Sequence, residues 1–161
     1  MRTAIYPGSF DPVTLGHLNI IRRASTIFDK VVVCCMVNSA KMGWFTLDER
    51  VDMLKRVTSR YINVTIDSSD ILIGEYAKRF EGAVLLKGLR ALSDFESEFS
   101  MAHINKKINS TLDTVFLTSD EKYTFLSSSA VKELARYEAD LTHFVPREIL
   151  DDVREKSKKM R

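Results

Sequence analysis

The run Val31-Val-Val-Cys-Cys-Met-Val37 is apolar at every position. A strand with one face in water alternates apolar and polar residues, whereas a strand covered on both faces reads as a continuous apolar run. Such strands are typical of parallel sheets, because the helices that connect parallel strands cover both faces of the sheet. The run therefore favours an α/β fold built on a parallel sheet.

The rest of the chain alternates short apolar runs with segments of helical spacing. Strands are expected at 4–6, 31–37, 63–66, 83–86 and 114–117, and helices at about 15–28, 46–57, 72–80, 93–106, 128–135 and 146–158. We find no internal repeat and no linker. This order predicts one α/β domain over residues 1–161, a doubly wound, Rossmann-like, five-stranded parallel sheet with helices on both faces and the last helix packed on it.

Three local patterns refine this prediction. Pro7-Gly8 should end the first strand, because proline and glycine commonly terminate strands. Thr46-Leu-Asp-Glu49 has the form of a capping box at the start of a helix. The apolar residues of the segment 72–80 fall on one side of a predicted helix, and the segment 93–106 is expected to form a helix that carries Phe95, Phe99 and Ala102.

The segment 3–28 reads as strand, polar loop and helix start, and we expect the functional centre here. The unpaired backbone N–H groups and the dipole at a helix start attract phosphate. His17 lies at this start and Ser9 lies on the strand side of the loop. The dinucleotide fingerprint G-x-G-x-x-G and the P-loop pattern are both absent. The residues alone therefore indicate a phosphate-binding loop and no finer class.

Topology adds further residues to this centre. In a doubly wound sheet of order 3-2-1-4-5, ligands bind outside the carboxyl ends of strands one and four. Lys87 and Arg90 follow strand four, Lys41 follows strand two, and the serines 127–129 follow strand five. Cations and a serine-bearing helix start around one crevice describe a polyphosphate site.

Each of these residues also has a structural interpretation. Lys41 could be an ordinary loop lysine, and Lys87 and Arg90 could pair with Asp94 or Glu98. The serines could be only a helix cap, and His17 a capping or surface histidine. In addition, Asp11 could hold the loop rather than a metal. His103 and His143 have no second metal-type side chain at ligand spacing, so both are interpreted as structural or surface residues.

Thr14-x-Gly16-His17 resembles the T/H-x-G-H signature of the nucleotidylyltransferase superfamily, and the string Tyr6–His17 is similar to one member, the phosphopantetheine adenylyltransferase family. Five further short sequence motifs are similar to that family in the same order, at 45–50, 88–90, 94–98, 125–133 and 142–146. The resemblance implies transfer of AMP from ATP to 4′-phosphopantetheine, which gives dephospho-CoA and pyrophosphate. It also implies Mg²⁺, a homohexamer and inhibition by coenzyme A.

The resemblance implies site roles at the matching positions. His17, Lys41, Arg90 and Ser9 would be catalytic, and Ser9, Lys41, Ile73 and Lys87 would bind phosphopantetheine. The ATP-binding set would be Ser9, Phe10, His17, Gly88, Leu89, Arg90, Glu98, Tyr123, Thr124, Phe125, Leu126, Ser127, Ser128 and Ser129. No residue is assigned as a metal ligand, since phosphate oxygens and water would hold magnesium. Many members have threonine in place of Ser9 and arginine in place of Lys87.

Two other functions remain open from the residues. A nicotinamide or nicotinate mononucleotide adenylyltransferase usually shows histidine where this chain has Thr14. A nucleotide sensor without catalysis would have no need of Ser9, His17, Lys41 and Arg90 together.

Composition excludes several classes. The net charge of +2 is too small to indicate nucleic acid as a partner. No apolar run approaches the roughly 18 residues of a membrane span, and no export signal is visible. The only two cysteines, Cys34 and Cys35, are adjacent within a strand, so we expect buried thiols and a cytoplasmic location.

Overall fold

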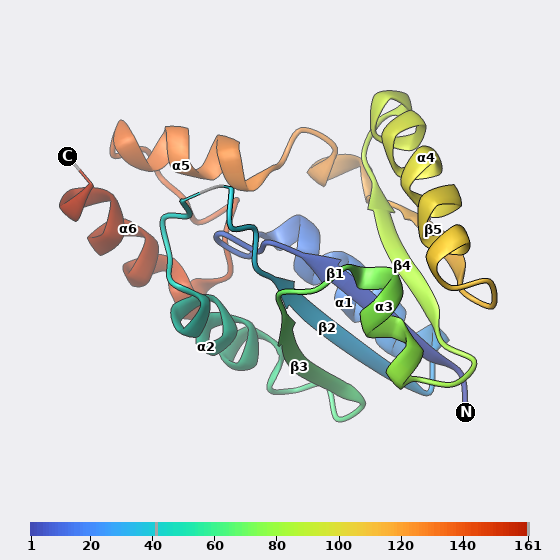
Figure 1. Cartoon of the computed structure of the whole chain (residues 1–161). Helices are drawn as coiled ribbons and strands as arrows, with labels where there is room; N and C mark the ends of the chain where they lie inside the picture. The colour runs from blue at the N-terminus through green and yellow to red at the C-terminus, as the bar shows by residue number, and fades with distance from the viewer. Residues whose placement is uncertain (41, 161) are drawn as a thin grey trace.

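The computed structural model describes residues 1–40 and 42–160 (Figure 1). Its centre is a five-stranded sheet in the order β3-β2-β1-β4-β5, and every neighbouring pair is parallel. The strands are β1 (Thr3–Gly8), β2 (Lys30–Met36), β3 (Val64–Ser69), β4 (Val84–Leu89) and β5 (Asp113–Thr118). The predicted fold class and strand order are confirmed.

Helices connect and flank the strands. The α-helices are α1 (Leu15–Ile27), α2 (Leu47–Thr58), α3 (Ile73–Tyr76), α4 (Leu92–Ile108), α5 (Ser128–Arg136) and α6 (Leu150–Lys159). Short 3₁₀ helices are η1 (Ala77–Arg79), η2 (Glu121–Tyr123) and η3 (Arg147–Ile149). Among the described helices, none is long and apolar enough to cross a membrane.

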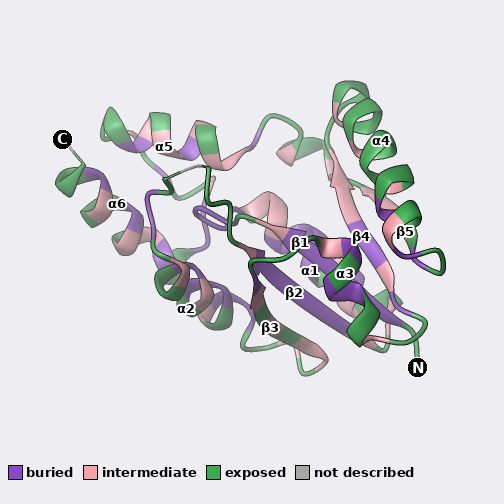
Figure 2. Ribbon diagram, in the orientation of Figure 1, coloured by how far each residue is buried: buried purple, intermediate pink, exposed green. Residues whose placement is uncertain are grey.

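Alternate residues of the central strands face two separate cores. Ala4, Tyr6, Val31 and Val33 pack with residues of α1, α2, α5 and α6, whereas Ile5, Val32 and Cys34 pack with Tyr76 and Ala77 of the α3–η1 segment. Figure 1 shows α1 behind the sheet and α3 in front of it. Both faces of β1 and β2 are buried (Figure 2), which explains the unbroken apolar run in β2.

The ladder between β1 and β4 is short. β1 pairs with β4 only at Ala4 and Ile5, whereas β1 pairs with β2 along its whole length and β4 pairs with β5 along its whole length. Beyond Ile5 the two central strands therefore part toward their carboxyl ends. A proline is tolerated at position 7 because β4 no longer requires an N–H donor from β1 there.

Three local predictions need correction. β1 does not stop before Pro7-Gly8 but includes both residues, which pair with β2, and ends at Gly8. Similarly, Lys87, Gly88 and Leu89 belong to β4, where they pair with β5, and not to a loop. The predicted helix 72–80 is a single α-helical turn followed by 3₁₀ helix η1. Gly74 in that turn packs so closely on Ile108 of α4 that an added Cβ would lie 3.0 Å from its Cγ2.

The predicted helix beginning near Ser93 is present as α4, but its apolar side lies largely outside the core. Asn105 is its only buried residue among those described, whereas Phe95 is 37% exposed and Phe99 48% exposed. The two rings contact each other, and Phe95 also contacts Phe116 of β5. α4 is largely green in Figure 2, so most of its surface lies outside the core of this chain.

Candidate active site

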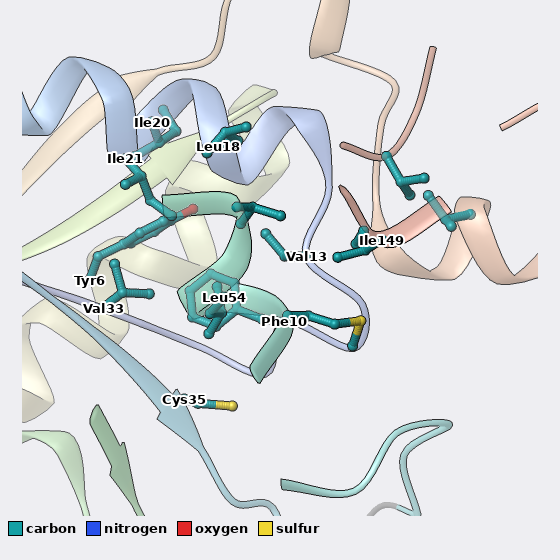
Figure 3. Packing of buried hydrophobic residues seen from close by; sticks show 14 of the residues in the cluster. Tyr6, Phe10, Val13, Leu18, Ile20, Ile21, Val33, Cys35, Leu54 and Ile149 are labelled. Carbon is teal, nitrogen blue, oxygen red and sulfur yellow. The ribbon is translucent and has the colours of Figure 1, made fainter. Parts of the chain in front are cut away.

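The loop between β1 and α1 is anchored in the core. Phe10 has a φ of 48°, and with this left-handed backbone conformation its ring packs into the protein, where Phe10 is only 2% exposed. The ring packs edge-on against Tyr6 at 5.4 Å and against His17 at 5.0 Å between centroids. Figure 3 shows Tyr6, Phe10 and Leu54 within the buried apolar cluster that packs between the sheet and the helices α1 and α2. The loop that carries Ser9, and the first turn of α1 with His17, are thus held in place by a buried ring.

His17 belongs to the cap of α1. Thr14 is the N-cap, and its hydroxyl accepts a hydrogen bond from the backbone N–H of His17. In return, the Nδ1 atom of His17 accepts from the backbone N–H of Thr14 at 3.0 Å. This arrangement is a capping box in which histidine takes the place of the usual Glu or Gln. The His17 side chain therefore both caps the start of α1 and lies beside the loop between β1 and α1.

The same contact sets the charge and the tautomer of His17. Burial, with a further contribution from the positive charge of Arg90, lowers the pKa of His17 to about 4. The imidazole is therefore neutral near pH 7. Because Nδ1 accepts from the backbone, the single proton lies on Nε2. The ring can donate one hydrogen bond from Nε2 to a ligand.

A hollow of about 470 Å³ lies where β1 and β4 separate. We call this the first hollow. Its lining is Tyr6, Pro7, Gly8, Thr14, Gly16, His17, Ile20, Lys87, Gly88, Arg90, Ser93, Asp94, Ser97, Glu98, Ser119, Tyr123, Leu126, Ser127 and Ser128. Its place at the carboxyl ends of β1 and β4 is the one predicted for ligand binding in this topology.

The cations of the first hollow are paired with carboxylates. Lys87 Nζ lies 3.1 Å from Glu98 Oε2, and Arg90 Nε lies 3.2 Å from Asp94 Oδ2. The structural alternative for Lys87 and Arg90, pairing with Glu98 and Asp94, is therefore observed. Arg90 also donates from Nη1 to the carbonyl of Leu126 at 3.0 Å, so it ties the start of α4 to the segment before α5. Burial raises the pKa of Asp94, but the hydrogen bonds and charge of Arg90 outweigh it and the pKa lies below its usual value.

A second hollow of about 380 Å³ lies beyond the carboxyl end of β2. Its lining is Ser9, Phe10, Asp11, His17, Met36, Asn38, Met42, Gly43, Arg50, Ser128, Ser129 and Lys132. His17 and Ser128 line both hollows. The imidazole and the first turn of α5 therefore stand between two adjoining spaces.

Asp11 joins three segments at the wall of the second hollow. Its carboxylate accepts from the backbone N–H groups of Trp44 and Phe45, at 2.9 Å each, and from Lys132 Nζ at 2.6 Å. Asp11 is 6% exposed. Burial raises its pKa, but the hydrogen bonds from Lys132, Phe45 and Trp44 outweigh burial and hold the pKa below its ordinary value. Asp11 therefore holds the loop before α2.

Comparison with known proteins decides the family. Residues 5–134 match the cytidylyltransferase-like family. The chain is 49% identical to phosphopantetheine adenylyltransferase of Caldanaerobacter subterraneus subsp. tengcongensis over 159 residues, 99% of either chain. It is also 47% identical to phosphopantetheine adenylyltransferase of Clostridium botulinum over 156 residues, 97% of this chain and 95% of that one.

The chain belongs to the phosphopantetheine adenylyltransferase family.

Solved structures with a similar fold come from other enzymes. A putative nicotinate-nucleotide adenylyltransferase from Vibrio parahaemolyticus matches with a TM-score of 0.69 and 15% identity, over 96% of this chain and 95% of that one. The nicotinic acid mononucleotide adenylyltransferase of Plasmodium falciparum, complexed with NaAD, matches with a TM-score of 0.65 and 13% identity, over 99% and 95%. At these identities the likeness shows the fold alone.

The structure brings together most of the residues that the likeness to phosphopantetheine adenylyltransferases assigned. Those on the first hollow are His17, Lys87, Gly88, Arg90, Glu98, Tyr123, Leu126, Ser127 and Ser128. Those on the second hollow are Ser9, Phe10, His17, Ser128 and Ser129. The ring of Phe10 is buried, so a ligand would have to contact the backbone of this residue. Lys41 lies outside the described residues.

Four assigned residues line neither hollow. Ile73 packs against the core cluster of Ile5 and Val32, Leu89 lines a shallow apolar depression beside Phe95, and Thr124 and Phe125 are exposed. Phe125 contacts Phe144 edge-on. The two hollows also separate Ser9 from Lys87, although both were assigned to phosphopantetheine.

Sequence reasoning missed several residues of these walls. Arg50 and Lys132 line the second hollow, and Asp94 lines the first. Asn19 of α1 donates to Asp120 at 2.6 Å and so ties α1 to the segment after β5. Arg50 could have been found from the sequence, because helical spacing places this charged residue on the same inward side of α2 as Leu47 and Leu54. Lys132 left none.

No group of three or more His, Cys, Asp or Glu side chains among the described residues is placed to hold a metal ion. Asp11, the carboxylate on the second hollow, is already bound by three donors. The walls therefore fit a magnesium ion only if phosphate oxygens and water supply most of its ligands.

Proposed function

We propose that this chain transfers AMP from ATP to 4′-phosphopantetheine and releases dephospho-CoA and pyrophosphate, the activity named for its relatives in the family. A phosphate oxygen of the acceptor forms a bond to the α-phosphorus of ATP, and the bond from that phosphorus to the pyrophosphate oxygen breaks. No covalent enzyme intermediate is required. The observation that carries the proposal is that two adjoining hollows meet at His17 and Ser128.

The chemical task of such a site is mainly positional. Two anions that repel each other must be held in line while negative charge on the transferred phosphate is stabilised. The first hollow, with Gly88, Arg90 and the segment 123–128, is assigned to ATP. The second hollow, with Ser9, is assigned to the acceptor phosphate. The reacting α-phosphate would then lie at their junction.

His17 is assigned to the transferred phosphate. Its Nδ1 is held by the backbone of Thr14, so the direction of Nε2–H is set before a ligand arrives. A neutral donor suits this role because it stabilises developing charge without taking up a proton. A donor fixed in advance also avoids reorganisation during the reaction.

The start of α5 is assigned to phosphate oxygens as well. The hydroxyl of Ser127 accepts from the backbone N–H of Ala130, and the hydroxyl of Ser128 donates to the carbonyl of Pro12 at 2.8 Å. The first N–H groups of a helix have no partner within the helix, and the dipole favours an anion there. Ser128 thereby ties this helix start to the loop that leads into α1 and His17.

Arg90 is assigned to the phosphates of ATP, and Lys87, on the resemblance, to the phosphate of the acceptor. Glu98 and Asp94 pair with these cations, so phosphate oxygens would compete with the carboxylates for them. Magnesium bound to the triphosphate would lower its charge and supply Lewis-acid activation. Lys41 is assigned to the acceptor phosphate on the resemblance alone.

Self-association and end-product inhibition belong to the same proposal. The exposed apolar side chains of α4, which are Leu92, Phe95, Phe99, Met101 and Ile104, support contact with another copy in a homohexamer. Coenzyme A carries both an adenine nucleotide and a pantetheine arm, so it would occupy both hollows and inhibit. Light scattering should give about six times the chain mass of 18.4 kDa.

The experiment that tests the reaction is release of pyrophosphate. Purified chain with ATP, Mg²⁺ and 4′-phosphopantetheine should release pyrophosphate and form dephospho-CoA in equal amounts. Nicotinamide mononucleotide in place of the acceptor should give no release above the background with ATP alone. Release with nicotinamide mononucleotide and none with 4′-phosphopantetheine would refute the proposal.

A further inference from the structure

Arg50 is a buried arginine at the floor of the second hollow. It is 9% exposed and lies in the first turn of α2. Its Nη1 donates to the carbonyl oxygens of Ser9 at 2.8 Å and Met36 at 3.1 Å, and lies 3.4 Å from Cys35 Sγ. One nitrogen therefore connects the ends of β1 and β2 where the second hollow opens.

The positive charge of Arg50 has no carboxylate partner among the residues that the structure describes. Asp11, which shares the hollow, binds Lys132 instead, at 2.6 Å. The Nε atom of Arg50 is buried and has no hydrogen-bond partner among the described residues. A buried charge without a counter-charge destabilises a fold.

The position in the helix increases this cost. Arg50 follows Leu47, the first residue of α2, by three positions, and the N-terminal end of a helix carries a positive partial charge. Aspartate and glutamate are favourable there and arginine is not. The carbonyl oxygens of Ser9 and Met36 and the Cys35 sulfur contact the guanidinium but carry no full negative charge, and no carboxylate among the described residues pairs with it. An anionic ligand in the hollow would account for a cation at this place.

We infer that Arg50 is an anion-binding residue of the second hollow and that its ligand is the phosphomonoester of the acceptor. The identity of the acceptor rests on the proposed function, whereas the anion site does not. Since Asp11 neutralises Lys132, the charge of Arg50 dominates the described side chains of this hollow. Ser9, Asn38 and Ser129 add neutral groups that can hydrogen-bond to phosphate.

The test uses inorganic phosphate as the probe, without ATP. Arg50→Lys keeps the charge but not the fork, and Arg50→Gln keeps a hydrogen-bond donor but not the charge. By calorimetry the dissociation constant for phosphate should rise about tenfold or more in R50Q and only about threefold in R50K, because a charge-assisted hydrogen bond is lost only in the first. Arg56→Gln, on the same helix but bound to Asp52 and Asp152, is the matched control and should leave the constant unchanged.

Equal weakening in R50Q and R50K would overturn the inference, because Arg50 would then act only by holding the ends of β1 and β2 together. Should R50Q fail to fold, the wild-type chain still provides a test by NMR. The side-chain Nε–H signal of Arg50, assigned by its loss in R50K, should shift as phosphate is titrated. An unchanged signal at saturating phosphate would overturn the inference.

The two proposals fail in different ways. If 4′-phosphopantetheine gives no pyrophosphate release but phosphate still binds in an Arg50-dependent manner, the proposed function fails and the anion site stands. If turnover is normal and R50Q binds phosphate as the wild type does, the anion site fails alone. In an active R50Q variant we expect KM for the acceptor to rise more than KM for ATP.

Discussion

Replacement of Asp11 by asparagine tests the contact that holds the second hollow. The carboxylate of Asp11 accepts three hydrogen bonds, two from the backbone N–H groups of Trp44 and Phe45 and one from Lys132. Asparagine keeps one acceptor oxygen but turns an NH₂ group toward one of these donors. It also leaves the ammonium of Lys132, whose side chain is 22% exposed, without its counter-charge.

The magnitude follows from burial. Removal of one partner of a buried ion pair costs about 3–5 kcal/mol, and the residual exposure of Lys132 places this site at the lower end, about 3 kcal/mol. For a chain of this length that corresponds to a fall in Tm of about 6–12 °C. Urea unfolding followed by circular dichroism would measure the free energy of unfolding for wild type and D11N.

The sign of the pH dependence is also determined. The pKa of Asp11 in the folded chain lies below the usual value of 3.8, so its stabilising contribution is fully present above pH 3.8 and is lost as the pH falls through the folded pKa. The difference between wild type and D11N should therefore be constant from pH 7 to about pH 5 and shrink below about pH 4.

The second variant is Lys132→Met, which removes the ammonium but keeps a side chain close in length to the aliphatic part of lysine. In a double-mutant cycle, D11N and K132M should show a coupling energy of at least about 1 kcal/mol. A loss below about 1 kcal/mol in D11N, or an absence of coupling, would refute the view that Asp11 holds the loop before α2 through this network.

Four further predictions concern the proposed site. His17→Ala should lower kcat about 10²–10³-fold with little change in fold, because one preorganised donor is lost, and near-normal turnover would remove His17 from the mechanism. The pKa of His17 is about 4 against a usual 6.5, so the folded chain should lose at most about 3 kcal/mol of stability as the pH falls from 6.5 to 4. Urea unfolding at pH 7 and pH 4.5 should show a loss of stability in wild type that is missing in His17→Gln. An equal loss in both proteins would contradict this prediction. Lys41→Ala should weaken binding of 4′-phosphopantetheine more than of ATP, and calorimetry showing the opposite order would contradict the assigned role. Gly43→Ala should cost about 1–3 kcal/mol in urea unfolding, because its Cβ would lie 2.9 Å from Asp11 Oδ2; an unchanged free energy of unfolding would show that the loop shifts without cost.

The sheet could be predicted from sequence because a parallel strand buried on both faces leaves an unmistakable apolar run. The order 3-2-1-4-5 was assumed from the doubly wound class of sheet rather than derived from particular residues, and it placed His17 and Arg90 at one edge. The ends of β1 and β4 could not be predicted, because Pro7 and Gly88 are locally unfavourable in strands. Pairing with β2 and β5 overrides this local preference.

The site was predicted less completely than the fold. Residues that directly follow a strand, such as Ser9 on the loop and His17 in the first turn of α1, can be predicted because the topology brings them to one edge of the sheet. Asp11 and Lys132 lie far apart in the chain and meet only through tertiary packing, so no spacing rule points to the pair. The exposure of the apolar side of α4 could not be predicted for a related reason, since helical spacing identifies an apolar side but not whether the same chain covers it.

The parting of β1 from β4 has a mechanical consequence. Two residue pairs join these strands, whereas each of the other three ladders has six, so the sheet consists of a three-stranded and a two-stranded part with a narrow seam. Any molecule seated across the seam touches both parts and supplies cross-links that the backbone lacks. Occupancy would stiffen the protein where its own hydrogen bonding is thinnest.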